Sequence, residues 1–408
     1  MTYKTAFVPA DILIPKCKDL KRWSVIACDQ FTSEPEYWQE AERYVGGAPS
    51  SLRLVLPEIY LGRPDTAQRI AGIDAAMREY LAAGLFEEYK SSMVYLERTQ
   101  SNGRIRCGIV GAIDLEEYDY RPGSHSQVRA TEATVVDRIP PRLEIRRGAE
   151  LELPHIMILI DDPGFSVIEP MADKCLRTLY DFDLMGGGGH VRGKLMGAQE
   201  IAEVDSALER LGQRCEMLFA VGDGNHSLAT AKEHYERLKK ANPGRDMSRH
   251  PARYALCEIV NLHSDALEFD AIHRLVRVDD PYKLIMEMSL ELGLSGIPSE
   301  QKVRIHRNYT ARDLYIREPK SKLSVGSVQI FLDSYLKENG GSIDYIHGED
   351  TIRRLASDEG MIGFEFEPIS KADLFPAVIA DGALPRKTFS MGHAQDKRYY
   401  LEARRIAE

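Results

Sequence analysis

A polar, glycine-rich turn is the part of the sequence best suited to chemistry. The apolar segment Met217 to Val221 runs into the sequence GDGNHS at residues 222–227, and a helical pattern then continues to Lys240. Such a turn directs free backbone N–H groups and a partial positive charge of roughly half a unit toward one point. Helix starts of this kind bind phosphates. Gly222 and Gly224 would let the backbone bend and approach a ligand closely.

Four side chains of this turn add to the predicted site. Asp223 would help to hold Mg²⁺, which proteins usually bind through one or two carboxylates together with substrate phosphates. His226 would donate a hydrogen bond to a phosphate oxygen or pass a proton. Asn225 and Ser227 would contact the phosphate directly. The alternative interpretation is a buried strand-to-helix turn with a capped helix start.

Residues 129–138 form a second candidate cluster, which we expect to be helical. At helical spacing, Arg129, Glu132 and Val136 lie on one face. Arg129 and Arg138 are suited to bidentate binding of phosphates or carboxylates. The alternative is a solvated helix whose local ion pairs each contribute a few tenths of a kcal/mol.

Two further basic segments are candidate anion sites. His273 and Arg274 follow a strand-like segment, and Lys387 and Thr388 lie in a basic, hydroxyl-bearing turn that could close over a phosphate. A structural histidine and a solvated loop are the respective alternatives.

Residues 188–195 nearly match the phosphate-loop pattern G-x-x-x-x-G-K-S/T. Leu195 stands where the pattern requires a hydroxyl group for Mg²⁺, and Tyr180 to Asp183 makes a poor preceding strand. We therefore expect a mobile glycine loop beside a site. The sequence also lacks H-E-x-x-H, C-x-x-C and G-x-S-x-G motifs.

Composition excludes several classes of function. The chain has 408 residues, 43% of them hydrophobic and 28% charged, as in globular proteins. Its net charge of −10 argues against nucleic acid as the main partner, and its apolar runs are too short to cross a membrane. The six dispersed cysteines indicate reduced thiols, and no signal peptide is evident, so we expect a cytoplasmic protein.

Strand and helix patterns alternate, which predicts a mixed α/β (α+β) fold. A helix is expected from Pro64 to about Leu81, and a hairpin over 93–113. Strands are expected at 23–28, 155–160, 254–262 and 362–366, a second hairpin at 302–318, and helices after Asp280 and at 325–339 and 371–379. The polar stretch 295–301 suggests a boundary between a main domain, 1–295, and a C-terminal α/β segment, 296–408, that either stands alone or packs onto the first.

The order of these clusters resembles the domain of unknown function 1015 family. Six segments each resemble one of the family's motifs: residues 23–29, 57–58, 129–138, 222–227, 272–276 and 384–388. In the first of them the family's tyrosine is replaced and its aspartate is displaced. Asn225 and Ser227 stand where the family's central motif has histidine and arginine, so the chain is identified as a divergent member. If that arginine binds phosphate in relatives, its role here would pass to Arg129, Arg274 or Lys387.

The same central motif is similar to that of free-serine kinases in the ParB/sulfiredoxin superfamily. This resemblance implies a ParB/sulfiredoxin-like element around residues 205–245 within a larger mixed sheet. It also implies a nucleotide-dependent kinase that uses ATP or ADP with Mg²⁺ and acts on a small metabolite, such as the amino acid serine.

Three functions therefore remain open. A phosphotransferase would use Asp223 for Mg²⁺ and His226 for a phosphate oxygen or a proton. It would use Glu132 or Asp29 as the general base for the substrate hydroxyl. A non-catalytic sensor would bind a phosphorylated or carboxylated metabolite without turnover. A DNA-associated protein is disfavoured by the acidic charge and the lack of a basic recognition helix.

Overall fold

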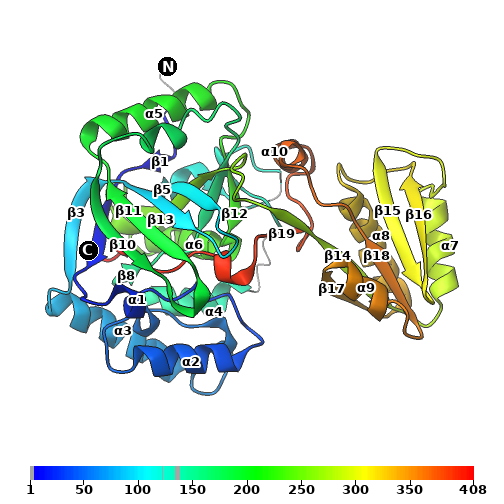
Figure 1. The fold of residues 1–408 in the computed structure, drawn as a ribbon, viewed down its shortest axis with the longest axis horizontal. Coiled ribbons are helices and arrows are strands. Elements are labelled where there is room, and N and C mark those ends of the chain that lie inside the picture. The colour runs from blue at the N-terminus through cyan, green and yellow to red at the C-terminus, as the bar shows by residue number, and fades with distance from the viewer. Residues whose placement is uncertain (1–3, 122, 134–137) are drawn as a thin grey trace. The chain divides into compact units, whose positions relative to one another are not determined.

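The computed structural model describes residues 4–121, 123–133 and 138–408 (Figure 1). The chain divides into two compact units: unit 1 is residues 1–130, 134–267 and 393–408, and unit 2 is residues 131–133 and 268–392. This division differs from the expected boundary at 295/296. The stretch 295–301 only connects a helix and a strand whose apolar side chains, such as Met288 and Val303, share one core.

Unit 1 is built on a ten-stranded mixed sheet. β12 runs parallel to β7 and antiparallel to β9, and β13 runs parallel to β9 and antiparallel to β5. β1 (Phe7–Val8) pairs with β5 off the main path. The order of the other strands is β10 (Arg177–Asp183), β11 (His190–Leu195), β4 (Val94–Thr99), β5 (Ile105–Asp114), β13 (Tyr254–Asn261), β9 (Met157–Ile160), β12 (Phe219–Asp223), β7 (Val128–Ala130) and β6 (Tyr118–Asp119).

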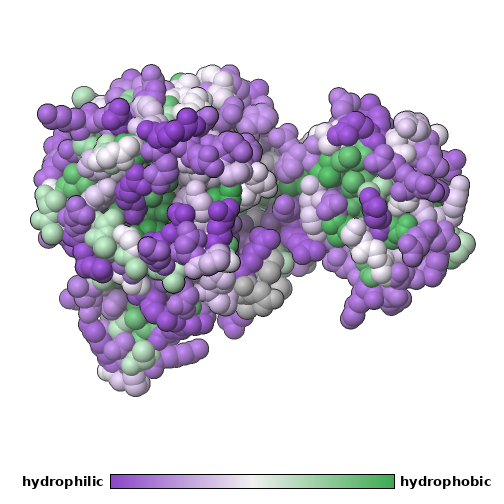
Figure 2. All heavy atoms as spheres, turned by 90° about the horizontal axis from the view of Figure 1, so that it is seen from below, coloured by the Kyte–Doolittle hydropathy of each residue, from purple (hydrophilic) through white to green (hydrophobic). Residues whose placement is uncertain are grey.

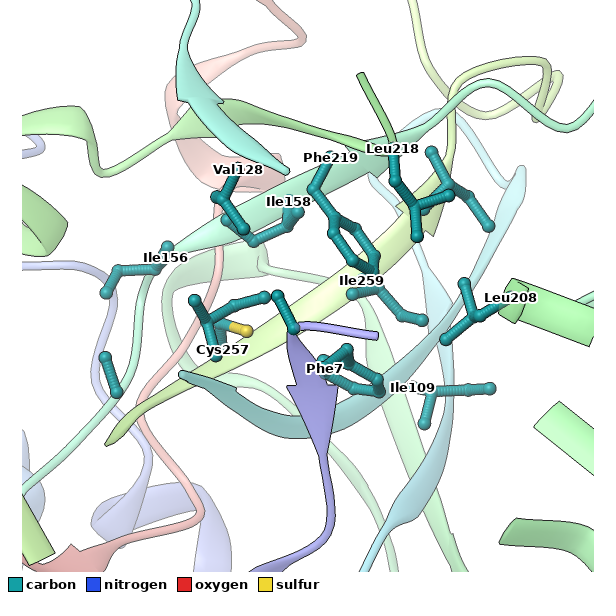
Figure 3. Close-up of a cluster of buried hydrophobic side chains, with 14 of the residues drawn as sticks. Phe7, Ile109, Val128, Ile156, Ile158, Leu208, Leu218, Phe219, Cys257 and Ile259 are labelled. Carbon is teal, nitrogen blue, oxygen red and sulfur yellow. The ribbon is translucent and has the colours of Figure 1, made fainter. Parts of the chain in front are cut away.

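The sheet alternates its side chains between two cores, as the period of a strand requires. On β5, Ile109 and Ile113 pack into one core while Val110 and Ala112 pack into the other. The first core also receives Leu208 and other side chains of α5 and α6, and Figure 3 shows part of it around Phe219. The second core receives apolar side chains of α1, α2 and α3. Helices therefore cover both faces of the sheet.

The helices and small sheets of unit 1 complete its two layers. Two two-stranded sheets add β2 (Ala10–Pro15) paired with β3 (Phe86–Ser92), and β8 (Leu151–Glu152) paired with β20 (Arg404–Arg405). The helices are α1 (Leu20–Trp23), α2 (Pro35–Val45), α3 (Thr66–Ala82), α4 (Ile139–Arg147), α5 (Ala198–Gly212) and α6 (Asn225–Ala241).

Unit 2 is a six-stranded antiparallel sheet with its own core. The strand order is β16 (Thr310–Ile316), β15 (Gln301–Arg307), β18 (Met361–Glu365), β14 (Phe269–Arg277) and β17 (Ser342–His347), and β19 (Phe389–Met391) also pairs with β14. The helices are α7 (Pro281–Glu291), α8 (Ser324–Asn339), α9 (Glu349–Leu355) and α10 (Lys371–Asp381).

The surface in Figure 2 is mainly hydrophilic, with apolar side chains in scattered patches. Among the helices of the described residues, none is long and apolar enough to cross a membrane.

The expected mixed α/β class is confirmed, with α5, β12 and α6 in the region 205–245. Both predicted hairpins and the helices after Pro64 and Asp280 are present. Three local expectations are wrong. Residues 23–28 form the end of α1 and a single bridge at Ile26 rather than a strand. Tyr180 to Asp183 does lie in a strand, β10, because pairing with β11 stabilises it.

The third error concerns residues 129–138. Arg129 lies in the buried strand β7 rather than in a helix, because β12 pairs with this segment in parallel. Glu132 forms a bridge with Leu384, and residues 134–137 lie outside the described residues.

Candidate functional site

The turn between β12 and α6 has the predicted strand-to-helix form. The pairing of β12 with β9 shifts in register between Val221 and Asp223, which places Gly222 at an irregularity just before the turn. Gly224 is the N-cap of α6 and has a φ of 79°. A Cβ atom at this position would lie 3.0 Å from the Cα of Ile156. Both the left-handed backbone and this close approach require glycine.

Asp223 is held by one backbone donor and one cation. Its Oδ1 accepts a hydrogen bond from the N–H of Gly224 at 3.0 Å, and its Oδ2 lies 3.2 Å from the Nζ of Lys397. The side chains of Asp223 and Lys397 are only 19% and 11% exposed, so water screens this pair weakly. The segment 393–408 thus brings a positive charge to the start of α6.

Ser227 begins a hydrogen-bonded chain that runs away from the turn. Its Oγ lies 3.0 Å from the Nε2 of His155, and the Nδ1 of His155 lies 2.8 Å from the hydroxyl of Tyr400. The Tyr400 hydroxyl also accepts the backbone N–H of Cys28 at 3.1 Å. Burial raises the pKa of Tyr400 well above its usual value, so the phenol stays protonated. Ser227, His155 and Tyr400 thus form a continuous hydrogen-bonded chain between α6 and the segment 393–408.

Asp29 lies near the same ring nitrogen of His155 as Ser227 does. Its Oδ2 is 3.9 Å from the Nε2 of His155, and its Oδ1 accepts a hydrogen bond from the Gln30 amide at 3.0 Å. Burial acts to raise the pKa of Asp29, but the charges of His155 and Lys397 and the Gln30 hydrogen bond outweigh it. The pKa therefore lies below its usual value. Asp29 is thus a carboxylate at neutral pH, close to a histidine and a lysine.

His226 lies in the first turn of α6 and is neutral at pH 7. Burial, followed by the positive charges of Arg142 and Arg138, lowers the pKa of His226 to about 4. Its Nε2 is buried and has no hydrogen-bond partner among the described residues. Arg142 forms an ion pair with Glu58, and Arg138 is an exposed residue at the N-cap of α4. A neutral imidazole with one uncommitted nitrogen therefore lies near two guanidinium groups.

The other predicted residues of unit 1 make mainly structural contacts. The Asn225 amide donates to the carbonyl of Val221 at 3.4 Å. Arg129 is 3% exposed, and its guanidinium donates to the carbonyl of Ser126 at 3.1 Å and to Glu216 at 3.3 Å. Binding of a phosphate by Arg129 would require these contacts to break.

The remaining predicted residues belong to unit 2, where the structure brings them together. Arg274 is fully buried, and its guanidinium donates to Gln329 at 2.7 Å and to the carbonyls of Lys387 and Arg386 at 3.0 and 3.2 Å. It therefore shapes the turn at 385–388, in which Thr388 donates to the carbonyl of Pro385 at 2.7 Å.

His273 and Glu132 also belong to unit 2. The His273 Nδ1 accepts the backbone N–H of Phe366 at 3.3 Å, and burial lowers the pKa of His273. Glu132 forms an isolated β-bridge with Leu384, and its negative charge acts to raise the pKa of Arg274. The predicted residues thus form two groups, one in each unit.

The carboxylates of unit 1 match Mg²⁺ in donor type. Across 4–121, 123–133 and 138–408, no group of three or more His, Cys, Asp or Glu side chains is placed to hold a metal ion. Asp223 and Asp29 supply the oxygen ligands that Mg²⁺ prefers. Lys397 already pairs with Asp223, so Mg²⁺ would have to share Asp223 with this lysine or displace it.

Sequence reasoning missed His155, Tyr400 and Lys397. None of them is close to the turn in sequence. Tertiary contacts of the folded chain bring them to it. The glycines of residues 186–189 lie between β10 and β11, where three of the four have positive φ, as a tight connection between antiparallel strands requires.

Several solved structures are similar to this chain. A mutant of free serine kinase in complex with ADP has a TM-score of 0.41 and 11% identity, and the match covers 74% of this chain and 93% of that one. A conserved hypothetical protein from Pyrococcus furiosus has a TM-score of 0.38 and 10% identity, covering 72% and 94%. C-terminally truncated SbnI from Staphylococcus aureus has a TM-score of 0.38 and 9% identity, covering 69% and 82%.

Sequence comparison gives the family. No curated protein matches the chain significantly. The sequence profile described as "Protein of unknown function (DUF1015)" matches residues 11–335, which is most of the chain, and the chain therefore belongs to that family.

Proposed function

We propose that unit 1 binds a nucleotide at the start of α6 and transfers a phosphoryl group to a hydroxyl of a small metabolite, such as the amino acid serine. The observation that carries this proposal is the gathering of Lys397, Asp223, Asp29 and His226 around one helix start. The helix start and Lys397 supply positive charge for a phosphate. The nearby carboxylates and imidazole supply groups for metal and proton handling.

Phosphoryl transfer suits such a site because it depends mainly on positioning and on charge stabilisation. The N–H groups of the first turn of α6 would bind the phosphates, and His226 would donate to one of their oxygens. Lys397 and Arg138 would offset the charge that spreads over the transferred group. ATP or ADP is the nucleotide that the motif resemblance implies, and bound Mg²⁺ would neutralise phosphate charge beside Asp223.

Asp29 is the candidate general base in unit 1. It is ionised at neutral pH, and a base must lie within hydrogen-bond reach of the proton that it accepts. The neighbouring His155 would hold Asp29 in place and, through its contact with Ser227, link it to α6.

A sensor that binds a phosphorylated or carboxylated metabolite without turnover is the alternative function. Two observations favour it. Asp223 is already paired with Lys397, and Ser227 is engaged by His155. Binding of an anion beside Lys397 requires neither a metal ion nor a general base.

Isothermal titration of ADP and ATP with Mg²⁺ tests the nucleotide site. We expect saturable binding to the wild type and about tenfold weaker binding to Lys397→Met, a loss of about 1.4 kcal/mol. Lys283→Met is the control, because Lys283 is a surface residue of α7. Absence of binding at millimolar nucleotide would end the nucleotide proposal.

Turnover separates the kinase from the sensor. Labelled ATP is incubated with the protein and a mixture of amino acids, and phosphorylated products are counted. More product than protein shows catalysis and excludes the sensor. An Asp29→Asn variant should retain nucleotide binding and lose turnover if Asp29 is the base.

A further inference from the structure

Ser227 carries a hydroxyl that the proposed transfer to a metabolite leaves unused. Its Oγ lies 3.0 Å from the Nε2 of His155, which precedes β9 in the chain. A hydroxyl within hydrogen-bond reach of an imidazole is the arrangement by which proteins activate serine as a nucleophile. The Ser227 side chain is partly exposed, so a donor molecule can reach it.

The His155 ring is held from its other nitrogen by Tyr400. The Nδ1 of His155 lies 2.8 Å from the Tyr400 hydroxyl, and the two rings meet edge to face. That hydroxyl already accepts the N–H of Cys28 at 3.1 Å, and a hydroxyl oxygen can accept two hydrogen bonds. In the tautomer with its proton on Nδ1, His155 donates to Tyr400 and keeps the Nε2 lone pair for the Ser227 proton. A base that is oriented by a third group completes the pattern of an activated nucleophile.

The carboxylate of Asp29 would stabilise the imidazolium that forms when His155 accepts this proton. The Asp29 Oδ2 lies 3.9 Å from the same Nε2. Asp29 is ionised at neutral pH, because its pKa lies below the usual value. An opposite charge at this distance favours the charged form of the imidazole.

The start of α6 can hold a phosphate that is bound to Ser227. Ser227 is the third residue of the helix. The N–H of Leu228 donates to the carbonyl of Gly224 at 3.0 Å and so closes the first turn. The N–H groups of His226 and Ser227 precede this bond and have no acceptor within the helix. A phosphoserine near a helix N-terminus gains charge-assisted hydrogen bonds from such groups.

We propose that Ser227 is a phosphorylation site and that its donor is the nucleotide bound at the same helix start, an inference that rests on the proposed function. The Ser227 Oγ forms a bond to the γ-phosphorus of ATP while the bond from that phosphorus to the β,γ-bridging oxygen breaks. ADP leaves, and the hydroxyl proton passes to the Nε2 of His155. The phosphate then occupies the N–H groups that hold the nucleotide, so the modified chain loses affinity for ATP.

Mass spectrometry of the full chain after incubation with ATP and Mg²⁺ tests this site, and titration of the same samples measures ATP binding. We expect one phosphate per chain, mapped to Ser227, and at least about tenfold weaker ATP binding to the modified protein. Ser227→Ala should stay unmodified, while Ser206→Ala, at an exposed serine of α5, should be modified like the wild type. Binding of ATP without phosphate on Ser227 would overturn the proposal while the nucleotide site remained. Unchanged ATP binding after modification would overturn the regulatory effect.

His155→Gln tests the base. General-base catalysis contributes about 10²–10⁴-fold, so we expect modification at least about 100-fold slower while ATP still binds. Modification at the wild-type rate would overturn the assignment of His155. If His155→Gln does not fold, as judged by circular dichroism, the mapped peptide and Ser227→Ala still decide whether Ser227 takes the phosphate.

Failure of ATP to bind would instead contradict the proposed function, and acetyl phosphate then replaces ATP as the donor. This molecule needs no nucleotide site, and acetate leaves in place of ADP. Phosphate on Ser227 in the wild type, with none on Ser227→Ala, would support the serine as a phosphoryl acceptor. No phosphate on Ser227 would overturn it.

Discussion

The Nζ of Lys397 lies 3.2 Å from the Oδ2 of Asp223, although the two residues come from distant parts of the chain. This pair joins the segment 393–408 to the turn before α6. It also acts on Asp29, whose pKa Lys397 helps to lower. One lysine therefore links the stability of unit 1 to the charge of its candidate site.

Replacing Lys397 by methionine should destabilise unit 1. The change leaves the largely buried Asp223 carboxylate without its cation, which we expect to lower the free energy of unfolding by about 1–3 kcal/mol. Urea denaturation measures the change. The control is Lys283→Met, whose lysine is 45% exposed and 3.8 Å from Glu287, and such surface pairs contribute about 0–1 kcal/mol. Equal losses for both variants would contradict a special role for the Lys397 pair.

His226 should make the protein less stable as the pH falls. Its pKa is lowered from 6.5 to about 4 in the folded chain, so the unfolded chain binds the extra proton between these values. Stability is therefore full above about pH 6.5 and falls as the pH drops toward 4. For His226 alone, the loss between pH 7 and pH 5 is at most about 2 kcal/mol.

Urea denaturation of His226→Gln at both pH values checks this expectation. The variant should lose less stability than the wild type on going to pH 5. His234 shows a similar lowered pKa but is present in both proteins, so the difference reports on His226. His125→Gln, at a highly exposed side chain, should behave as the wild type does. A His226→Gln protein with the full wild-type pH dependence would rule out the burial of a neutral ring.

Tyr400→Phe should weaken the chain of hydrogen bonds at His155. The change removes the acceptor of the half-buried Cys28 N–H and the partner of the buried His155 Nδ1. We expect a loss of about 1–3 kcal/mol in the free energy of unfolding. Tyr309→Phe, at an exposed hydroxyl, provides the matched control and should change stability by less than about 0.5 kcal/mol.

Gly224→Ala should destabilise the turn for two reasons. The position has a φ of 79°, and the new methyl group would lie 3.0 Å from the Cα of Ile156. Gly62→Ala separates the two effects, because Gly62 has a φ of 72° with nothing within 4 Å of an added Cβ. We expect about 1–2 kcal/mol for the backbone strain alone at Gly62 and a larger loss at Gly224. Thermal unfolding measures both, and similar losses would contradict the close packing of the turn against Ile156.

Local patterns were sufficient for much of the fold. The hairpin of β4 and β5 follows from alternating residues around a polar turn, and α7 follows from its Asp280 cap. The turn before α6 was predictable because its glycines and polar residues are adjacent in sequence. Each of these features is decided by neighbours within a few positions, which is why the sequence pattern suffices.

Features decided by distant contacts were not predictable. Arg129 has helical spacing with Glu132, yet its segment forms strand β7, which pairs in parallel with β12. Lys397 and Tyr400 have no motif that relates them to the turn, and only the path of the segment 393–408 brings them there. Tertiary pairing overrides local preference in the first case and creates a new neighbourhood in the second.

The order of the two units along the chain has a consequence for how the protein is made. Unit 2 is inserted between residue 267 and residue 393 of unit 1. During synthesis on the ribosome, unit 1 cannot be completed until the whole of the inserted segment has emerged. Until then it lacks Lys397, Tyr400 and strand β20. A nascent chain stopped at Gly392 would carry the turn before α6 but could not give Asp223 its lysine partner.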